Sequence, residues 1–323
     1  MVNDNSSVII EARDLMKSFG PIRAVDHIDL QVKKGEIFGL VGPDGAGKTT
    51  TMRMLATILP ADAGAISVLG YDGRREAERI KEHIGYMPQR FSLYGDLTVI
   101  ENLEFYAEIY GVSRQVREQR KKDLLEWANL TRHSYKLTDQ LSGGMKQKLA
   151  LACNLIHEPA VLFLDEPSTG VDPVARRDFW RILFRLREEG ATIMVSTPYM
   201  DEAERCDRIA FTYNGRILTC STPAAVKNLF RGQLLLLRAE TIAMLHAARD
   251  YLRREHLLAD VLIYGDALHL VTDDALETAR LLPGLLDRQG IRVTHLQPIP
   301  PSLEDTFAYL VRQAGGFAGR ESA

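Results

Sequence analysis

The sequence predicts an α/β fold in which parallel strands alternate with helices, followed by a smaller α+β domain. Two apolar runs, Glu36–Val41 and Val161–Glu166, are typical of strands buried on both faces of a parallel sheet. A segment with helical character, Thr49–Leu55, follows the first run, and Pro60 marks its end. The second domain is predicted by a renewed succession of strand-like and helical segments over residues 232–315.

The loop between the first strand and its helix, Gly42–Thr49, reads Gly-Pro-Asp-Gly-Ala-Gly-Lys-Thr and fits the phosphate-binding pattern G-x-x-x-x-G-K-[ST]. Glycines allow the backbone to wrap closely around an anion with its N–H groups pointing inward, and the helix N-terminus adds a partial positive charge. Lys48 is then expected to reach the outer phosphates, and Thr49 to bind Mg²⁺. The structural alternative is a glycine-rich turn that binds nothing.

Four further segments occur in one order along the chain. Asp165 and Glu166 end a buried strand, at the edge where open α/β sheets bind ligands. Taken singly, each segment has a structural alternative, because an acid pair after a strand is often a solvated loop and Ser-Gly-Gly is usually a turn. Their combination in this order points to a single site. The segments are Gly85–Gln89, Leu141–Gln147, Val161–Glu166 and Ser168–Asp172.

These residues make the chain resemble the ATP-binding cassette family, specifically its exporter-type nucleotide-binding subunits, over about residues 8–230. Leu-Ser-Gly-Gly at Leu141–Gly144 is the signature of that family. The wording Gly143–Leu149 and the segment after residue 230 resemble drug- and polyketide-exporting type-2 exporters. The resemblance implies a phosphate-loop nucleotide-binding domain over residues 1–231, with a RecA-like core, an antiparallel β subdomain and a helical insertion at about residues 91–141.

The resemblance also implies roles for individual residues in binding ATP and Mg²⁺. Glu166 would polarise the attacking water as general base, and Lys48 and Gln89 would be the other catalytic residues. Thr49 and Gln89 would organise Mg²⁺, with Asp165 in its outer shell. The phosphate-binding residues would be Gly42, Pro43, Asp44, Gly45, Ala46, Gly47, Lys48, Thr49 and Thr50.

Five more residues match positions that complete the nucleotide site in this family. Ser142, Gly143 and Gly144 would reach the γ-phosphate bound by the opposite subunit. Asp172 would belong to the loop that couples the two sites. Phe19 matches the aromatic residue that stacks on adenine, although a lone phenylalanine near a strand is more often part of the core.

The signature implies partners. In the family it resembles, the phosphate loop and the Leu-Ser-Gly-Gly loop lie on opposite flanks of one domain, so two domains face each other head to tail with ATP between them. This arrangement supplies donors to a γ-phosphate that a single domain leaves open. We expect a second nucleotide-binding domain, integral membrane permease subunits, and as a further candidate a periplasmic adaptor.

One position departs from the family pattern. The family usually places a histidine after the strand that follows the acid pair, whereas Pro198 stands there, after the predicted strand Ala191–Ser196. No histidine lies between residues 158 and 245. Proline offers neither a side-chain donor nor a backbone N–H. Two interpretations remain open: the family tolerates the change, or the site hydrolyses weakly beside a competent second half. A smaller departure is Asp44, where the family commonly has Asn.

The composition fits a cytosolic globular protein. The net charge of −3 gives no indication of nucleic-acid binding, and the three cysteines lack a disulfide spacing, with Cys153 expected in the core. No apolar run is long enough for a membrane helix, and Met1–Ser7 is too polar for a signal peptide. We therefore expect a cytoplasmic protein, peripheral on the inner face of the cell membrane, with separate subunits forming the channel.

The remaining segments predict local structure. Residues 8–35 alternate as in an antiparallel sheet, and Thr98–Trp127 has helical spacing, with its charged run Arg114–Asp123 as a solvated helix face. In residues 232–315 the order β-α-β-β-α-β plus a helix predicts a split βαβ layout. Pro283 is expected to kink or split its helix, and Ile291–Leu296 to form a strand. Residues 316–323 are expected to be a tail.

Three classes of function follow. The first is the ATPase subunit of an efflux transporter. The second is a regulatory module that binds ATP at a dimer interface while a partner half hydrolyses it. The third, a soluble cassette ATPase that acts on ribosomes or DNA, is disfavoured because such proteins usually carry tandem cassettes or long coiled-coil insertions, and this chain has one cassette and neither insertion. The C-terminal domain is expected to stabilise the dimer or to regulate it.

Overall fold

The computed structural model describes residues 8–90, 93–258 and 260–315 of the 323-residue chain. The chain divides into two compact units, Met1–Pro223 and Ala224–Ala323. This division lies before the domain boundary expected at residue 231. The expected tail at 316–323 lies outside the described residues.

The first unit is built on a six-stranded sheet in the order β10-β9-β3-β8-β7-β6. All residues of β3, β7 and β8 are buried, which explains their unbroken apolar runs. Neighbouring strands are parallel except β10, which pairs antiparallel with β9. The strands are β3 (Ile37–Val41), β6 (Ile84–Met87), β7 (Val161–Asp165), β8 (Thr192–Thr197), β9 (Arg208–Tyr213) and β10 (Arg216–Ser221).

The register of this sheet positions the site. Val41 of β3 pairs with Thr197 of β8, and Asp165 of β7 pairs with Ser196 of β8. The carboxyl ends of these three strands therefore lie side by side. The loops that leave them carry the phosphate-loop pattern, the acid pair and Pro198, so the parallel register gathers segments far apart in the chain at one edge of the sheet.

A second, four-stranded sheet has the order β2-β1-β4-β5. Its long strands β1 and β2 are antiparallel, as the alternation over residues 8–35 predicts. Helix α1 (Lys48–Leu55) packs between the two sheets, and its Met52 and Leu55 share one core with residues of both. The strands are β1 (Val8–Phe19), β2 (Ile22–Lys33), β4 (Ala63–Val68) and β5 (Tyr71–Asp72).

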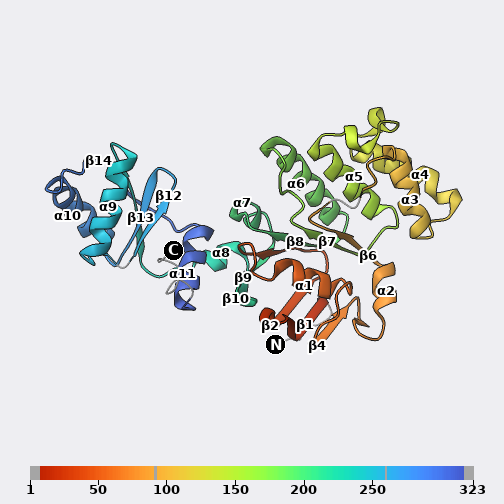
Figure 1. The fold of residues 1–323 in the computed structure, drawn as a ribbon, viewed down its shortest axis with the longest axis horizontal. Helices are drawn as coiled ribbons and strands as arrows, with labels where there is room; N and C mark the ends of the chain where they lie inside the picture. The colour runs from red at the N-terminus through yellow and green to blue at the C-terminus, as the bar shows by residue number, and fades with distance from the viewer. Residues whose placement is uncertain (1–7, 91–92, 259, 316–323) are drawn as a thin grey trace. The chain divides into compact units, whose positions relative to one another are not determined.

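The remaining helices of this unit complete the layers. Figure 1 shows α1 on one face of the six-stranded sheet and α5 and α6 on the other, with α3 and α4 at the end farthest from β1 and β2. Cys153, in α5, is fully buried as predicted. The helices are α2 (Ala77–Glu82), α3 (Val99–Ile109), α4 (Arg114–Trp127), α5 (Gly143–Leu155), α6 (Pro173–Glu188) and α7 (Met200–Ala203), with short 3-10 turns at Thr131–His133 and Thr138–Gln140; α8 (Pro223–Lys227) leads into the second unit.

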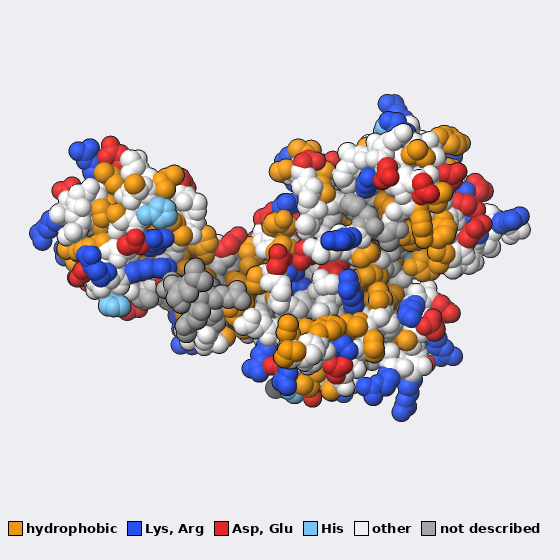
Figure 2. All heavy atoms as spheres, in the orientation of Figure 1, with side chains coloured by type: hydrophobic (Ala, Val, Ile, Leu, Met, Phe, Trp, Pro, Cys, Tyr) orange, Lys and Arg blue, Asp and Glu red, His pale blue; other side chains and the backbone are white. Residues whose placement is uncertain are grey.

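The prediction that Arg114–Asp123 forms a solvated face is wrong at two positions. Arg117 and Lys121, one turn apart on α4, are buried. Both bind the carboxylate of Glu104 on α3, the lysine at 2.6 Å. The charge of these side chains predicts that they are exposed. Because α4 packs against Glu104 of α3, however, their aliphatic parts are buried while their charged groups pair with the carboxylate. Elsewhere on the face that Figure 2 shows, acidic and basic side chains are interspersed.

The second unit follows the predicted order of elements. Its antiparallel sheet has the order β12-β13-β11-β14, so β13 separates the two strands joined through α9, which is the split βαβ layout. Its core lies between this sheet and the helices α9 and α10. The elements are β11 (Gln233–Ala239), α9 (Ile242–Arg254), β12 (Asp260–Tyr264), β13 (Ala267–Thr272), α10 (Ala275–Asp287), β14 (Val293–Ile299) and α11 (Leu303–Gln313).

Of the two outcomes expected at Pro283, a split is excluded, because α10 continues through it to Asp287. One local prediction in this unit is wrong. The last strand begins at Val293 and not at Ile291, because the Ile291 N–H binds the Leu286 carbonyl and closes the helix. Ser302 caps α11: its hydroxyl accepts the Asp305 N–H, and the Asp305 carboxylate accepts the Ser302 N–H.

Candidate functional site

The phosphate-loop segment connects β3 to α1, and its backbone requires glycine at two places. A Cβ on Gly42 would lie 2.2 Å from the Thr212 carbonyl oxygen. Gly47 has a φ of 96°, and a Cβ there would lie 2.3 Å from the Ala24 carbonyl oxygen. Only glycine permits both the left-handed turn and the close approach of these chain segments. The loop is thereby fixed between β2, β9 and α1.

A cavity of about 600 Å³ opens at this loop. Its wall brings together the predicted Phe19, two segments of the phosphate loop, Gln89 and Glu166. Phe19 ends β1 and is 49% exposed, so it is not part of the core. The lining residues are Phe19, Ile22, Arg23, Ala24, Asp44, Gly45, Gly47, Lys48, Thr49, Thr50, Gln89, Glu166 and Asn214.

Lys48 is the buried cation of the cavity. Its Nζ donates to the carbonyl oxygens of Gly42 and Pro43 at 2.9 and 3.0 Å and lies 3.1 Å from Glu166 Oε1. The second carboxylate oxygen of Glu166 accepts a hydrogen bond of 2.9 Å from Gln89 Nε2. The amide of Gln89 and the ammonium of Lys48 thus hold the Glu166 carboxylate from two sides.

Asp165 forms a separate group directly beside it. Asp165 is fully buried, and its Oδ1 accepts hydrogen bonds from Thr49 Oγ1 at 3.1 Å and Ser196 Oγ at 2.6 Å. Tyr86 OH donates to the other oxygen at 3.3 Å. Burial and the charge of Asp165 raise the pKa of Tyr86 to about 12, so the phenol stays a donor. Hydroxyl and carboxylate oxygens of this kind are the donors that Mg²⁺ prefers.

The backbone of Glu166 is unusual for a glutamate. Its φ is 48°, in the left-handed region. The Glu166 N–H is held by the Ser196 hydroxyl at 2.9 Å, next to the Ser196 carbonyl at 3.2 Å. The chain therefore turns sharply where β7 ends, and this turn directs consecutive acid side chains to different partners, Asp165 to Thr49 and Glu166 to Lys48.

The signature residues do not line this cavity. Ser142 caps α5, and its hydroxyl accepts the Met145 N–H at 3.4 Å. Gly143 follows as the first residue of α5, and a Cβ on Gly144 would lie 2.7 Å from the Ala175 Cβ of α6. Asp172 caps α6 by accepting the Val174 and Ala175 N–H groups at 3.0 Å. The N-termini of α5 and α6 are therefore in contact, so the signature residues and the Asp172 loop lie next to each other.

The segment at Pro198 is held by its neighbours. Thr197 Oγ1 donates to the buried carboxylate of Glu202 at 2.6 Å and accepts the Tyr199 N–H at 3.1 Å. The Tyr199 ring lies 4.4 Å from the Arg176 guanidinium of α6. Ser168 Oγ also donates to Glu202. Glu202 thus ties the loop after the acid pair to the loop after β8.

Sequence reasoning missed Tyr86, Ser196, Glu202 and Asn214. Ser196 and Tyr86 belong to strands, where a polar residue in an apolar run was the available signal. Glu202 lies in the acid-rich segment Asp201–Glu204, a pattern that is typical of a solvent-exposed segment. Asn214 lies in a turn, where asparagine is common. The predicted residues fit a bound nucleotide and a divalent cation. The phosphate loop has backbone positions, Gly42 and Gly47, at which any side chain would clash, and Thr49 and Asp165 supply oxygen atoms that can bind a metal.

Comparisons with known proteins decide the family. The ABC transporter family profile matches residues 25–169. The chain is 35% identical over 303 residues to the daunorubicin/doxorubicin resistance ATP-binding protein DrrA of Streptomyces peucetius, which spans 92% of this chain and 88% of that protein. The chain belongs to the ABC transporter family. A second relative, the Nod factor export ATP-binding protein I of Burkholderia lata, is 36% identical over 308 residues, 93% of this cassette and 96% of that protein.

Another relative matches a shorter part of this chain. The probable multidrug ABC transporter ATP-binding protein YbhF of Escherichia coli is 47% identical over 219 residues, which are 68% of this chain and 38% of that protein. This chain therefore spans less than half of that relative.

Solved structures confirm the fold of the cassette. The structure of an ATP-binding subunit of an ABC transporter has a TM-score of 0.63 at 31% identity, over 69% of this chain and 93% of its own. The cassette MJ0796, dimeric in a post-hydrolysis state with ADP and Pi, has a TM-score of 0.61 at 25% identity, over 66% of this chain and 98% of its own. Among the described residues of this cassette, no helix has the length and apolar character needed to cross a membrane.

Proposed function

We propose that this chain is the ATP-binding and ATP-hydrolysing subunit of an efflux transporter. The observation that carries the proposal is the pair of neighbouring clusters at the phosphate loop, Lys48 with Glu166 and Gln89, and Thr49 with Asp165. One cluster contains a cation and a carboxylate base, and the other offers oxygen ligands for a metal. Relatives described as multidrug, drug-resistance and Nod factor export proteins support the direction of transport.

The roles follow from the contacts. Lys48 would exchange its carbonyl partners for phosphate oxygens of MgATP, and the loop N–H groups would surround those oxygens. Bound Mg²⁺ would supply charge neutralisation at the reacting phosphate. Thr49 and Gln89 would organise it, with Asp165 in its outer shell. Glu166 would accept a proton from the attacking water, since Gln89 keeps its carboxylate directed toward the cavity. Phe19 would pack against the adenine.

The position of the signature supports a dimer. Ser142, Gly143 and Gly144 are outside the cavity, so a second nucleotide-binding domain would have to bring its own signature to this one. We infer a head-to-tail pair in which each Asp172 loop moves with the neighbouring signature, because α5 and α6 touch at their N-termini. The pair would sit on the cytoplasmic face of the membrane against integral permease subunits, with a periplasmic adaptor as a further partner.

The domain limits are part of the same proposal. Residues 1–231 would form the nucleotide-binding domain, with the helical part at about 91–141 facing the permease, and residues 232–315 an accessory domain that stabilises or regulates the dimer. The deciding experiment measures ATP affinity and steady-state turnover of the purified wild type and of Glu166→Gln. Binding without turnover in the variant supports the proposal, and equal turnover in both refutes the assignment of the base.

A second function is favoured by one observation. Pro198 stands at the end of β8, while Tyr199 beside it packs on Arg176, so neither residue is among those that line the cavity. A nucleotide site that lacks a hydrogen-bond donor at position 198 fits a regulatory cassette, which binds ATP while a second, competent cassette hydrolyses it. Turnover of the isolated protein, measured with and without a second cassette ATPase, separates the two functions: slow turnover that only the partner restores favours regulation.

A further inference from the structure

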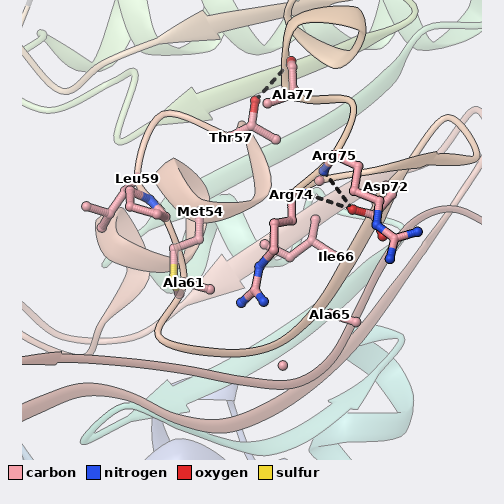
Figure 3. Close-up of a pocket in the computed structure, with 13 residues that line it drawn as sticks. Met54, Thr57, Leu59, Ala61, Ala65, Ile66, Asp72, Arg74, Arg75 and Ala77 are labelled. Atoms are coloured by element: carbon pink, nitrogen blue, oxygen red, sulfur yellow. Dashed lines mark hydrogen bonds between the residues drawn. The ribbon is translucent and has the colours of Figure 1, made fainter.

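A second cavity, of about 440 Å³, lies at the opposite end of α1 from the phosphate loop. Its floor is apolar and comes from Leu59 and Ala61 of the loop after α1 and from Ile66 of β4. Met54 of α1 also borders the cavity but is fully buried, so it can report on the floor without touching a ligand. Two arginines, Arg74 and Arg75, stand on its rim. Figure 3 shows the Arg74 side chain extending into the space between Ala61 and Ile66, while Arg75 extends along the rim beside Asp72.

The turn that carries these arginines is fixed in place. The Asp72 carboxylate accepts the N–H groups of Arg74 and Arg75, both at 2.9 Å. The Gly73 N–H binds the Ile66 carbonyl at 2.9 Å, and a Cβ on Gly73 would lie 3.0 Å from the Ile66 Cβ. The turn therefore lies tightly on β4, and both arginines leave it from a rigid base, which lowers the entropy that a ligand must offset.

Among the described residues, the two guanidinium groups form no hydrogen bond or ion pair. The Asp72 carboxylate lies near both: its pKa is lowered by the N–H groups of Arg75 and Arg74 and, to a smaller extent, by the charges of these two arginines. The next arginine, Arg79, differs, since it binds Glu76 at 3.0 Å on the same helix turn. An unpaired guanidinium beside an apolar floor matches a ligand that has an anionic head and an apolar body.

We propose that this cavity binds a small organic anion, with its carboxylate or phosphate head on Arg74 and Arg75 and its apolar body on Leu59, Ala61 and Ile66. The site is separate from the nucleotide cavity, because the two share no lining residue. Head and body make distinct demands: the head requires negative charge, and the body requires a short apolar chain.

The test uses the full-length protein with isotope-labelled methionine methyl groups, in which the Met54 signal is assigned by its loss in Met54→Leu. Hexanoate is the probe, and its concentration dependence is followed by NMR at the Met54 methyl. Hexylamine has a similar tail with the opposite charge, and acetate has the head alone. Hexanoate should shift the Met54 signal with saturation, whereas hexylamine and acetate should be much weaker.

The arginine variants complete the test. The double variant Arg74→Ala/Arg75→Ala should weaken hexanoate binding about tenfold or more, because two charge-assisted hydrogen bonds are lost. Arg79→Ala is the control for the loss of a nearby arginine outside the cavity lining: it removes one of the same side chains from the neighbouring turn, and it should change the affinity within about twofold. The proposal is overturned if hexanoate leaves the Met54 signal unmoved, if hexylamine binds equally well, or if the double variant binds like the control.

Discussion

Lys48 and Lys121 are both buried lysines of the first unit, and both pair with glutamate, yet their surroundings differ. Lys121 Nζ lies 2.6 Å from Glu104 and 2.7 Å from Glu118, and Arg117 binds the same Glu104. Lys48 has one carboxylate partner, Glu166, and two neutral carbonyls. The charge of Lys121 is neutralised within the protein, whereas the charge of Lys48 faces a cavity. Ion pairs that lie wholly inside the protein contribute to its stability. An ion pair that lines a cavity, as Lys48 and Glu166 do, can exchange a partner for a charged ligand.

The largest effect is expected from removing the lysine that faces the cavity. Lys48→Ala should weaken ATP binding about 100-fold or more, because the cation that would meet the phosphates is lost. Lys121→Ala is the matched control, and its ATP affinity should equal that of the wild type. Fluorescence or calorimetric titration with MgATP checks both. If the ATP affinity of Lys48→Ala is unchanged, Lys48 does not bind the phosphates, and its role does not differ from that of Lys121.

The glutamates extend the comparison. Glu166→Gln keeps the shape and removes the base, so turnover should fall about 10²- to 10⁴-fold. ATP affinity should be kept or increased, because Lys48 loses a competing carboxylate. Glu104→Gln, the corresponding change in the other cluster, should leave turnover near the wild-type value. Steady-state phosphate release and ATP titration of both variants are the measurements. If the Glu166→Gln and Glu104→Gln variants hydrolyse ATP at the same rate, Glu166 is not the base.

Pro198 offers a gain instead of a loss. A positioned donor at a developing anion is typically worth about 10²- to 10³-fold in rate, so the homodimer should bind MgATP well and turn over slowly. Pro198→His should raise turnover about tenfold or more when β8 keeps its register. The wild type provides the sharper measurement. Fast hydrolysis by the isolated protein, abolished by Glu166→Gln, would show that Pro198 is no defect.

The smallest effect is expected in the paired cluster and is one of stability. Burial alone would raise the pKa of Glu104, but hydrogen bonds from Lys121 and Arg117 outweigh it and hold the pKa below 4.5. A depressed folded-state pKa adds stability above the unfolded value, and this stability is lost as the pH falls through the folded value. Glu104→Gln should lower the unfolding midpoint by about 1–2 °C at pH 7, because the Glu104 side chain is 36% exposed and solvent weakens its ion pairs.

Thermal unfolding across pH tests this sign. Below pH 4.5 the midpoints of wild type and Glu104→Gln should converge, because the wild-type carboxylate becomes protonated. Glu101→Gln is the comparison on the same helix, because hydrogen bonds from the Thr98 hydroxyl and N–H, and no cation, lower the pKa of Glu101. It shows how much of the pH-dependent difference arises without an ion pair. A constant difference between wild type and Glu104→Gln at every pH would show that the ion pairs contribute no stability.

The same two clusters show what the sequence could predict. Lys48 and Glu166 lie in motifs whose spacing is set by a strand, a turn and a helix, so local pattern was sufficient to bring the loop and the acids to one sheet edge. Glu104 and Lys121 come from different helices, and their meeting depends on how α3 packs on α4, which no motif encodes. For the same reason Arg117 was expected in solvent.

Within the site the limit of prediction is similar. The strand that carries Ser196 was expected, and the strand that carries Tyr86 was not. The partners of both side chains follow from parallel register, in which Asp165 stands opposite Ser196. Glu202 is tied to Ser168 and Thr197 by packing across loops. At Ile291 a hydrogen bond closing α10 outweighed strand character. Motif residues could be named from sequence, and the residues that orient them could not.

The left-handed backbone of Glu166 has an evolutionary consequence. A residue with a side chain pays roughly 1–2 kcal/mol for this conformation, and branched residues pay most, while asparagine, aspartate and glycine adopt it more readily. Lineages in which this cassette abandons hydrolysis but keeps its fold should therefore drift toward those three residues at position 166. The turn limits the paths along which a motor subunit can become a silent one.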